Sequence, residues 1–302
     1  MDTYVLRSGC KINLTLHITA VRGDGMHELD SLFWPLDEPH DELTLTVLAP
    51  GAGLRVLCGN GIDPEHNTLT KACRNFADAC GFAPDLELTL NKGVPSGAGL
   101  GGGSADAAAL LLWLNSHAPA PLPAEKLAEC AAKIGADVPF FLINKPCRAQ
   151  GIGERLTPVP ELAERMKGWN VLLACPDVHV STPWAYGAWD QLHKNGKTPQ
   201  PSVLTNAEAE DKGNALAASA QGTLDAGIQL FNAFESVVFS AYPQVASLKA
   251  AIMDLGADAA VMSGSGAAVC GLFSPKNAAR GEDLLRVFEE RNIKAWWQAL
   301  SA

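Results

Sequence analysis

The stretch "PSGAGLGGGSADAA" at residues 95–108 holds the residue types that most directly suggest chemistry. Five glycines fall between positions 97 and 103, and a run of helix-forming residues follows them at once. Glycine adopts positive φ without strain and lets bare N–H groups approach a ligand. A helix that starts at the end of such a stretch adds a partial positive charge. Residues 95–104, named here the first glycine loop, are therefore suited to binding a phosphate.

The first glycine loop also matches, in part, the motifs of other nucleotide sites. Gly97, Gly99 and Gly102 satisfy the dinucleotide pattern G-x-G-x-x-G. That pattern expects a parallel strand after the helix, whereas prolines and another helix follow here. The pattern G-x-x-x-x-G-K-[ST] fails because no lysine follows the glycines, and the protein-kinase signatures H-R-D and D-F-G do not occur downstream. A flexible turn that binds nothing is the remaining alternative.

Strands are expected on the N-terminal side of this loop. The segment "KINLTLHI" alternates isoleucine and leucine with polar residues, which predicts a half-buried strand, and "DELTLTVL", "GLRVLC" and "LELTL" show a similar alternation. Between the last two, "NTLTKACRNFADACGF" has helical spacing, with Asn67 as the expected N-cap and Gly81 as the expected end. The loop leads into a helix expected over residues 104–116, which is apolar nearly all round and therefore buried.

The second half of the sequence alternates helices with short strands. A helix ends at Gly135 and is followed by the turn "GADVPFF", which holds Asp137. The proline-rich "LTPVPELAERMKGW" is expected to be a domain junction, and the polar stretch at residues 194–222 a loose segment. Strands "NVLLACP", "AAVM" and "AAVCGLF", with the turn "SGSG" between the last two, and helices near 183–192, 223–240 and 243–255 complete an α+β pattern.

Composition places the chain among folded proteins, with two domains expected. Its 302 residues are 47% hydrophobic and 19% charged, which is ordinary for a globular protein. With a net charge of −10, the chain has no basic run for a nucleic-acid backbone. No apolar run approaches the roughly 20 residues that span a bilayer. The composition therefore predicts neither nucleic acid nor membrane as a partner.

Cysteine usage predicts a reducing compartment. The 8 cysteines are scattered, with no C-x-x-C pair and no histidine at zinc spacing, so they are expected to be reduced and mostly buried thiols. The start, "MDTYVLRSGC", has neither the apolar core of a secretion signal nor the character of a transit peptide. A cytoplasmic protein is expected.

Four segments resemble those of one kinase superfamily. "PSGAGLGGGSADAA" is similar to the phosphate loop P-x-x-x-G-L-G-[GS]-[GS]-S of the galactokinase, homoserine kinase, mevalonate kinase and phosphomevalonate kinase (GHMP) superfamily. "VMSGSGAAVCGLF" resembles its C-terminal glycine motif, so that residues 263–266, named here the second glycine loop, would close near the phosphates. "CKINLTLHITAVRGDGMHEL" and "GADVPFF" resemble the branch that acts on the cytidine diphosphate-linked polyol 4-diphosphocytidyl-2-C-methyl-D-erythritol. The resemblance spans the chain and is weakest over residues 194–222.

The resemblance implies an α+β fold of two domains. Residues 1–160 would form an N-terminal ATP-binding domain of ribosomal-S5-domain-2-like fold, and residues 161–302 a C-terminal ferredoxin-like GHMP kinase domain. The implied activity is transfer of the γ-phosphate of ATP to the 2-hydroxyl of the polyol, in the non-mevalonate isoprenoid pathway. Mg²⁺ would be bound mainly through the nucleotide phosphates, and no protein ligand is assigned to it. A monomer or weak homodimer is expected.

The residues that the resemblance assigns to ATP are the first glycine loop and one asparagine before it. They are Asn67, Pro95, Gly97, Gly99, Leu100, Gly101, Gly102, Gly103 and Ser104. Backbone N–H groups of the loop would surround the triphosphate as an anion-binding concavity. Asn67 and Ser104 have a second interpretation, as caps of the helices that follow them.

Lys11 and Asp137 are the implied catalytic pair. Asp137 would accept the proton of the acceptor hydroxyl or orient it, and an ammonium beside it would keep it ionised. Without the resemblance, Asp137 is more simply explained as a helix cap and Lys11 as an exposed strand lysine. Asn13, two residues along the same strand, would hydrogen-bond near the acceptor, or else satisfy a neighbouring backbone group.

The cytidine side of the substrate is implied to contact Met26, His27, Thr182 and Tyr186. His27 would read the cytosine edge, and Tyr186 would stack on the base. The family usually has a second stacking tyrosine where this chain has Met26, whose polarisable thioether can still cover a ring. The alternatives are a solvated histidine and aromatic residues that belong to the core.

Other functions remain open at the level of the sequence. A homoserine or mevalonate kinase would share the glycine loops but not the pair His27 and Tyr186. A dinucleotide-dependent oxidoreductase is favoured by the G-x-G-x-x-G match alone. A nucleotide-binding module without catalysis would leave Asp137 as a cap.

Overall fold

Two compact units make up the structure, and each is assembled from separate stretches of the chain. The computed structural model describes residues 2–59, 63–193, 224, 227–278 and 281–300. The first unit comprises Met1–Lys11, Pro35–Ser96 and Gly101–Lys145, and the second unit comprises Ile12–Trp34, Gly97–Leu100 and Pro146–Ala302. These bounds do not follow a single cut in the sequence, so the domain division at residue 160 stays a prediction.

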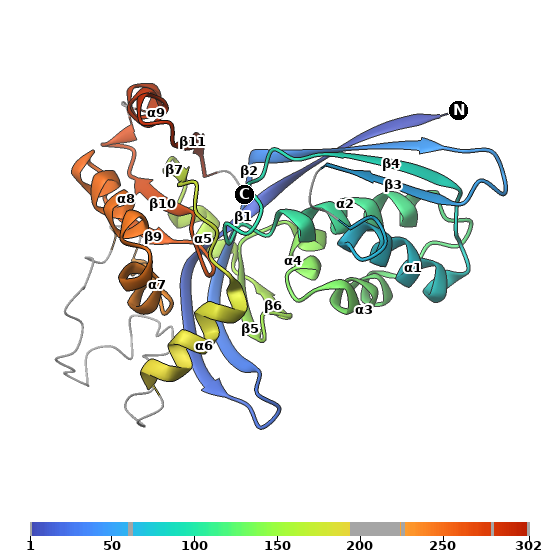
Figure 1. Ribbon diagram of the computed structural model, residues 1–302, viewed down its shortest axis with the longest axis horizontal. Coiled ribbons are helices and arrows are strands. Elements are labelled where there is room, and N and C mark those ends of the chain that lie inside the picture. The colour runs from blue at the N-terminus through green and yellow to red at the C-terminus, as the bar shows by residue number, and fades with distance from the viewer. Residues whose placement is uncertain (1, 60–62, 194–223, 225–226, 279–280, 301–302) are drawn as a thin grey trace. The chain divides into compact units, whose positions relative to one another are not determined.

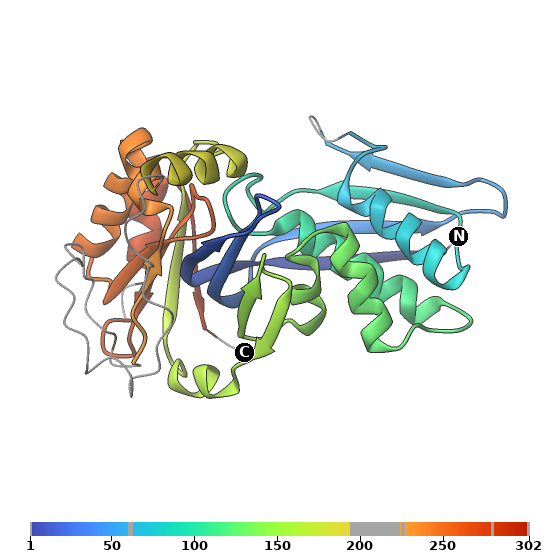
Figure 2. The same cartoon turned by 90° about the horizontal axis from the view of Figure 1, so that it is seen from below.

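The first unit is a sheet with helices packed on one face (Figures 1 and 2). Its strand order is β3-β4-β2-β1. Strand β4 runs antiparallel to β2 and parallel to β3, and the parallel pair is joined through helix α1. The elements, in chain order, are part of β1 (Thr3–Val21), part of β2 (His27–Val47), β3 (Leu54–Cys58), α1 (Thr68–Cys80), β4 (Leu86–Asn91), α2 (Gly102–His117), α3 (Ala124–Ile134) and α4 (Val138–Ile143).

Helix α2 is the buried centre of the first unit. Its apolar residues lie on most sides of the helix, and it packs against α1, α3 and α4. A helix that is apolar all round must be covered by neighbours, which explains why three other helices surround this one. Helix α1 begins after Asn67, whose side chain accepts the N–H of Thr70, and ends at Gly81, as the sequence predicts.

The second unit contains a four-stranded antiparallel sheet of order β11-β7-β10-β9. Strands and helices alternate in the β-α-β-β-α-β manner of ferredoxin-like folds, which confirms the predicted α+β class. Helix α8 packs on β9 and β10, and α9 packs on β11. The elements are β5 (Cys147–Gly151), β6 (Arg155–Pro158), α5 (Pro160–Arg165), β7 (Asn170–Cys175), α6 (Thr182–His193), β8 (Phe231–Asn232), α7 (Glu235–Ala241), α8 (Pro243–Asp254), β9 (Ala259–Met262), β10 (Val269–Phe273), α9 (Gly281–Glu290) and β11 (Lys294–Ala299).

Strand β1 is more buried than its alternating sequence predicts. Every residue from position 10 to position 18 is buried, so both faces of this stretch are covered. Polar side chains on the second face are accommodated by hydrogen bonds or, at His17, by stacking on the ring of Phe231 at 4.5 Å. The Thr15 hydroxyl, for example, accepts the N–H of Leu32 at 3.0 Å. The prediction of a half-buried strand is therefore wrong for the central part of β1.

Two further segments bear on the sequence-based expectations. The proline-rich stretch expected to be a junction forms β6 and α5 within the second unit. The stretch at residues 194–222, expected to be loose, lies outside the described residues. The helix expected near 223–240 begins only at Glu235, as α7.

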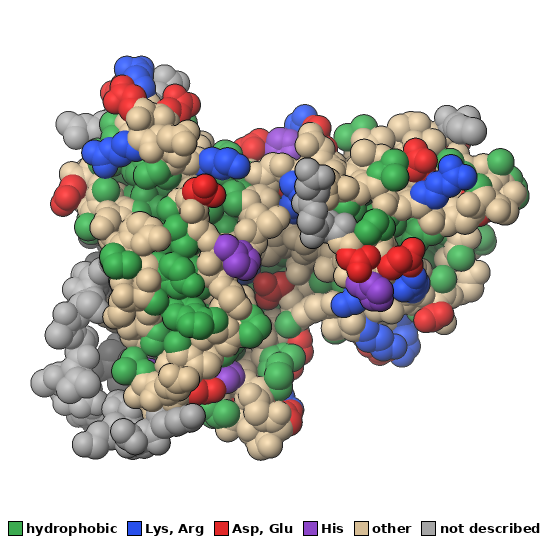
Figure 3. Space-filling view, in the orientation of Figure 1, with side chains coloured by type: hydrophobic (Ala, Val, Ile, Leu, Met, Phe, Trp, Pro, Cys, Tyr) green, Lys and Arg blue, Asp and Glu red, His purple; other side chains and the backbone are tan. Residues whose placement is uncertain are grey.

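Charged side chains of both signs are mixed on the surface. On the face in Figure 3, lysine and arginine side chains lie among aspartate and glutamate side chains. Within the described part of the chain, no helix has both the length and the apolar content that a membrane span requires.

We predict that Phe76→Ala destabilises the protein by about 3–5 kcal/mol, the usual cost of a large cavity in a packed core. Phe76 is 0% exposed. Leu57→Ala is the control, because Leu57 lies on strand β3 with 50% of its surface exposed and should cost far less. Urea unfolding of both variants measures the difference. Equal losses of unfolding free energy would contradict the assignment of Phe76 to the core.

Candidate active site

The two glycine loops contact each other inside the second unit through their backbones. Gly99 has φ of 79° and Gly264 has φ of 55°, values that glycine adopts without strain. A Cβ on Gly99 would overlap the carbonyl oxygen of Ser263, and a Cβ on Gly264 would lie 2.9 Å from the Cα of Gly99. The N–H of Ala268 also donates to the carbonyl of Ala98, at 3.1 Å. The close approach therefore depends on glycine at both positions.

Buried hydrogen bonds from Asn13 and Ser263 hold the second glycine loop. The side-chain oxygen of Asn13 accepts the N–H of Gly264 at 2.9 Å, and its amide nitrogen donates to the Ser31 hydroxyl at 2.9 Å. The Ser263 hydroxyl donates to the carbonyl of Gly99 at 3.0 Å and accepts the N–H of Asn13 at 3.2 Å. Asn13 thus satisfies a neighbouring backbone group, and its contact with an acceptor stays a prediction.

Residues 101–104 of the first glycine loop belong to the first unit and lead into α2. The helix begins at Gly102, two residues earlier than predicted, and no side chain caps it. Ser104 is therefore inside the first turn, where its N–H donates to the carbonyl of Gly101 at 3.0 Å. The interpretation of Ser104 as an N-cap is wrong. The first N–H groups of a helix have no intrahelical acceptor, so those of Gly102 and Gly103 are donors that a phosphate can use.

A buried carboxylate anchors the chain just before the first glycine loop. Asp41 is 0% exposed, and its Oδ1 accepts the N–H groups of Gly93 and Val94 at 2.7 and 2.8 Å. Its Oδ2 pairs with the ammonium of Lys92. A Cβ on Gly102 would lie 3.2 Å from the same Oδ2, so this carboxylate also packs beneath the start of α2. The sequence analysis did not single out either Asp41 or Lys92.

Asp106 on α2 completes this charged set. Its Oδ2 lies 3.2 Å from Nζ of Lys92, and its Oδ1 accepts a hydrogen bond from Ser8 at 2.6 Å. Burial raises the pKa of Asp106 to about 6, and Lys92 opposes this rise. Two carboxylates and one ammonium thus share a small buried volume, which makes the charge on Asp106 costly.

Lys11 and Asp137 lie together in the first unit. Nζ of Lys11 is 3.9 Å from Oδ2 of Asp137, and the lysine is only 4% exposed. Burial lowers the pKa of Lys11, and the charge of Asp137 opposes that effect. Asp137 stands at the N-cap position of α4, yet its side chain makes no capping hydrogen bond. The exposed-lysine interpretation is therefore wrong, and capping does not account for the position of the Asp137 carboxylate.

The first glycine loop packs against Lys11, one member of this pair. A Cβ on Gly101 would lie 3.3 Å from Cγ of Lys11 and 3.2 Å from the ring of Phe141 on α4. The stem of Lys11 and the ring of Phe141 thus both pack against Gly101. Within one unit, the start of α2, an ammonium and a carboxylate are brought together.

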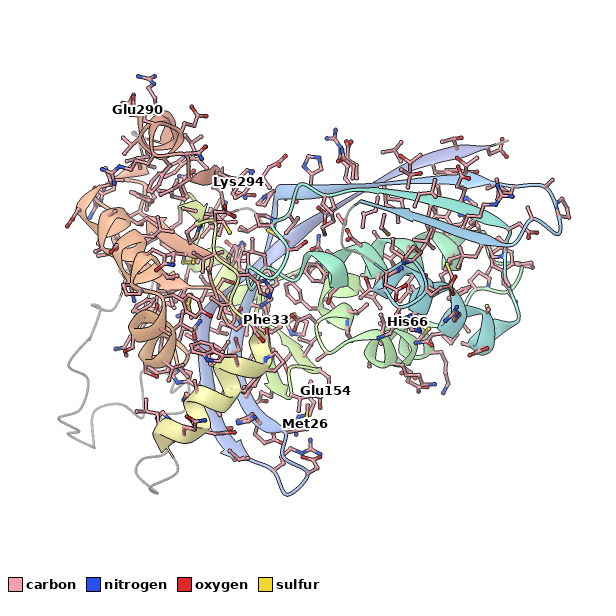
Figure 4. All side chains as sticks on the ribbon, viewed as in Figure 1. Met26, Phe33, His66, Glu154, Glu290 and Lys294 are labelled. Atoms are coloured by element: carbon pink, nitrogen blue, oxygen red, sulfur yellow. The ribbon has the colours of Figure 1, made fainter. Side chains whose placement is uncertain are left out.

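His27, Tyr186 and Asp190 form a cluster in the second unit. Nε2 of His27 is 2.7 Å from Oδ1 of Asp190, and the rings of His27 and Tyr186 are 4.5 Å apart. Trp189 presents its ring edge-on to His27 at 5.9 Å. His27 is 8% exposed, so it is not a solvated turn residue. Met26, beside it, is 47% exposed at the tip of the β1–β2 hairpin (Figure 4).

Thr182, at the start of α6, belongs to the same unit as this cluster. Its hydroxyl lies 2.8 Å from that of Ser265 in the second glycine loop. Helix α6 therefore carries residues that contact both the β1–β2 hairpin and the second glycine loop.

Asn67 and Pro95 complete the predicted set, both in the first unit. The side chain of Asn67 accepts the N–H of Thr70 at 2.9 Å and donates to the carbonyls of Asp63 and Pro64 at 2.8 and 2.9 Å. Asn67 is therefore a helix cap in this structure, and its contact with adenine stays a prediction. Pro95 is partly buried at the start of the first glycine loop.

Comparison with known families agrees with this arrangement. The model of the "GHMP kinases N terminal domain" matches residues 67–145, and that of "GHMP kinases C terminal" matches residues 213–289. The first match contains the first glycine loop and Asp137, and the second contains the second glycine loop. The chain is a GHMP kinase.

The relatives narrow the family further. A curated 4-diphosphocytidyl-2-C-methyl-D-erythritol kinase of Nitratidesulfovibrio vulgaris (strain DP4) is 51% identical over 290 residues, which cover 96% of this chain and 95% of the relative. A crystal structure of 4-(cytidine 5'-diphospho)-2C-methyl-D-erythritol kinase is 31% identical with a TM-score of 0.74, over 99% of this chain and 100% of that one. The chain belongs to the 4-diphosphocytidyl-2-C-methyl-D-erythritol kinase family.

A more distant structure shows how far the fold extends. Homoserine kinase from Cytophaga hutchinsonii has a TM-score of 0.68 at 18% identity, over 99% of this chain and 94% of that one. At this identity the likeness concerns the fold alone.

We predict that Gly99→Ala lowers kcat/KM for ATP about 10²-fold, the loss that a displacement of about 1 Å in bound groups produces. The added Cβ would overlap the Ser263 carbonyl and force the glycine loops apart. Steady-state kinetics with varied ATP measures the effect.

Gly53→Ala is the matched control for that change. Gly53 has φ of 77°, similar to that of Gly99, but a Cβ there would meet nothing within 4 Å. The Gly53→Ala variant has the same backbone strain without the overlap, so its kcat/KM for ATP should equal that of the wild type. A similar loss in both variants would show that strain, rather than the contact between loops, is responsible.

We predict that Asp106 makes stability depend on pH. Its folded pKa of about 6 lies above the unfolded value of 3.8, so its stabilising contribution is complete below about pH 4 and is lost as the pH rises to about 6. Relative to Asp106→Asn, the wild type should therefore be more stable at about pH 4 than at about pH 7. Urea unfolding of both proteins at the two pH values measures this. A pH-independent difference would contradict the raised pKa.

Proposed function

We propose that this enzyme transfers the γ-phosphate of ATP to the 2-hydroxyl of 4-diphosphocytidyl-2-C-methyl-D-erythritol, with Asp137 and Lys11 at the reacting oxygen. The observation that carries the assignment of these two residues is the buried lysine 3.9 Å from a carboxylate that caps no helix. The chain is an ATP-dependent kinase of the non-mevalonate isoprenoid pathway, by its membership of the family.

Backbone groups bind the triphosphate in this proposal. Phosphoryl transfer has a loose transition state, so catalysis rests on positioning and on neutralising charge. The N–H groups at residues 99–103 supply donors, and the uncapped start of α2 supplies a partial positive charge. Residues 97–100 are held against the second glycine loop by Ser263 and Ala268. Such a rigid set of donors requires little reorganisation when ATP binds.

Asp137 and Lys11 act on the acceptor in this proposal. Asp137 accepts the proton of the attacking hydroxyl, which aligns the oxygen with the γ-phosphate. Lys11 stabilises the negative charge that develops on the transferred group. The surroundings of Lys11 support this role, since its buried ammonium has little water around it and interacts strongly with nearby charges.

The cytidine end is recognised by residues of the second unit in this proposal. His27 reads the edge of cytosine, and Tyr186 contributes its ring to the base site. Met26 covers the base in place of the family tyrosine, and its exposure leaves it free to move onto a ligand. Thr182 lies one helical turn before Tyr186 and is proposed to contact the substrate from the same helix.

Mg²⁺ is proposed to accompany ATP. Among the residues that the structure describes, no three histidine, cysteine or acidic side chains gather as a metal site. The ion would be carried mainly by the nucleotide phosphates and would supply neutralisation of their charge.

The cellular compartment and the partners of the enzyme are proposed from its free thiols and its net charge. All 8 cysteines are free, which suits the reducing cytoplasm. The net charge of −10 disfavours nucleic acid as a partner. The active species is proposed to be a monomer or weak homodimer.

We predict that Asp137→Asn lowers kcat with the cytidyl substrate by about 10²- to 10⁴-fold, because the amide cannot accept the hydroxyl proton. Binding of ATP should persist. The measurement is ATP consumption with the cytidyl substrate, homoserine and mevalonate in parallel. Asp254→Asn, at an exposed carboxylate, is the control and should keep the wild-type rate.

Two results would refute parts of this proposal. Absence of turnover by the wild type with the cytidyl substrate, together with turnover of homoserine or mevalonate, would refute the substrate assignment. An unchanged kcat in Asp137→Asn would refute the role of Asp137 while leaving the substrate assignment intact.

A further inference from the structure

We propose that Asp190 is a positioning residue that makes the enzyme prefer cytosine to uracil, by fixing which ring nitrogen of His27 carries the proton. This inference rests on the proposed function, in which His27 reads the base. It concerns a residue that neither the sequence motifs nor the comparison with relatives assigns. The observation behind it is the hydrogen bond of 2.7 Å between Nε2 of His27 and Oδ1 of Asp190.

The partner of Nε2 determines the form of the neutral imidazole. A carboxylate is an acceptor only, so Nε2 must donate its hydrogen to Asp190. The neutral ring then has no hydrogen on Nδ1, which becomes an acceptor. In this arrangement Nε2 of His27 donates to Asp190, and Nδ1 can accept a hydrogen bond from a ligand.

The ring of His27 is held in place by its neighbours. Tyr186 packs on it at 4.5 Å with the ring planes tilted by 36°, and Trp189 meets it edge-on at 5.9 Å. Tyr186 is itself packed edge-on against Phe234, at 4.8 Å. With its ring 8% exposed, His27 has little room to flip and exchange its two nitrogens. The orientation and the tautomer are therefore set together.

The position of Asp190 on α6 supports this role. It lies four residues after Tyr186, one helical turn further along the same face. Its side chain is 35% exposed, compared with 8% for that of His27, so the carboxylate reaches from the edge of the cluster to a buried ring. A plain surface ion pair would have two exposed partners.

An acceptor on His27 distinguishes the two pyrimidines. At the corresponding position cytosine carries an amino group, which donates, and uracil carries a carbonyl oxygen, which accepts. The acceptor nitrogen of His27 therefore accepts a hydrogen bond from the amino group of cytosine. The carbonyl oxygen of uracil, also an acceptor, cannot form this hydrogen bond and is repelled. A site built to hydrogen-bond one group rejects an analogue that lacks it because its own polar atoms stay unpaired.

The test compares cytidine and uridine ligands at about pH 8. The variants are Asp190→Asn, whose amide can donate as well as accept, and Asp190→Ala, which offers no partner. Asp177→Asn is the matched control, because it makes the same chemical change at an exposed carboxylate before α6. Titration calorimetry with CDP and UDP measures binding independently of turnover. Kinetics with the cytidyl substrate and its uridyl analogue then give KM and kcat separately.

The wild type and Asp177→Asn should bind CDP about tenfold more tightly than UDP, a difference typical of one hydrogen bond. In Asp190→Ala this preference should largely disappear, and in Asp190→Asn, whose amide can partner either tautomer, it should shrink. KM for the cytidyl substrate should rise while KM for ATP stays unchanged, a split that a general loss of structure would not produce.

An unchanged CDP-over-UDP ratio in both Asp190 variants would overturn the inference, as would equal binding of CDP and UDP by the wild type. Failure of the proposed function is recognised separately, as absence of turnover of the cytidyl substrate by the wild type.

Discussion

The contact between Gly99 and residues 263–264 is the constraint on which the nucleotide side of the structure depends. It brings two segments far apart in sequence so close that neither has room for a Cβ. Backbone packing of this kind is stiff, because it has no side chain that could change rotamer. The N–H groups of the first glycine loop are consequently aimed by main-chain geometry, which suits a ligand that is recognised mainly as a charge.

An acidic protein that binds an anionic nucleotide must solve an electrostatic problem locally. This chain does so with few cations. Lys11 is buried beside Asp137, and Lys92 is shared by Asp41 and Asp106. Each ammonium is matched by carboxylates, so in the proposed function the positive charge offered to the bound phosphates comes largely from backbone N–H groups and the start of α2. Such donors do not repel one another as a cluster of lysines would.

The sequence predicts the parts of this structure that are local or belong to a family motif. The cap at Asn67, the end of α1 at Gly81 and the α+β class follow from residue types and spacing. The early start of α2 was missed because Gly101, with no side chain to cap the helix, takes the N-cap position. Asp190 was missed because its partner His27 lies 163 residues away, and no periodicity in a single sequence signals such a pair. Asp41 was missed for a different reason. In a sequence with a strand pattern, a buried aspartate cannot be told from one that faces solvent.

Strand β1 carries Lys11 at the end of one unit and Asn13 at the start of the other, within a stretch covered on both faces. Adjacent strand residues point to opposite sides, so one extra or missing residue here would exchange the faces of both side chains and of the aliphatic residues between and after them. A substitution in this strand therefore alters one side chain, whereas a change in its length alters the faces of all the residues that follow. Changes in length have to be absorbed where the backbone leaves the sheet, and the exposed turn before Met26 is such a place. The two-residue spacing of Lys11 and Asn13 is thus what keeps both side chains on one face of β1.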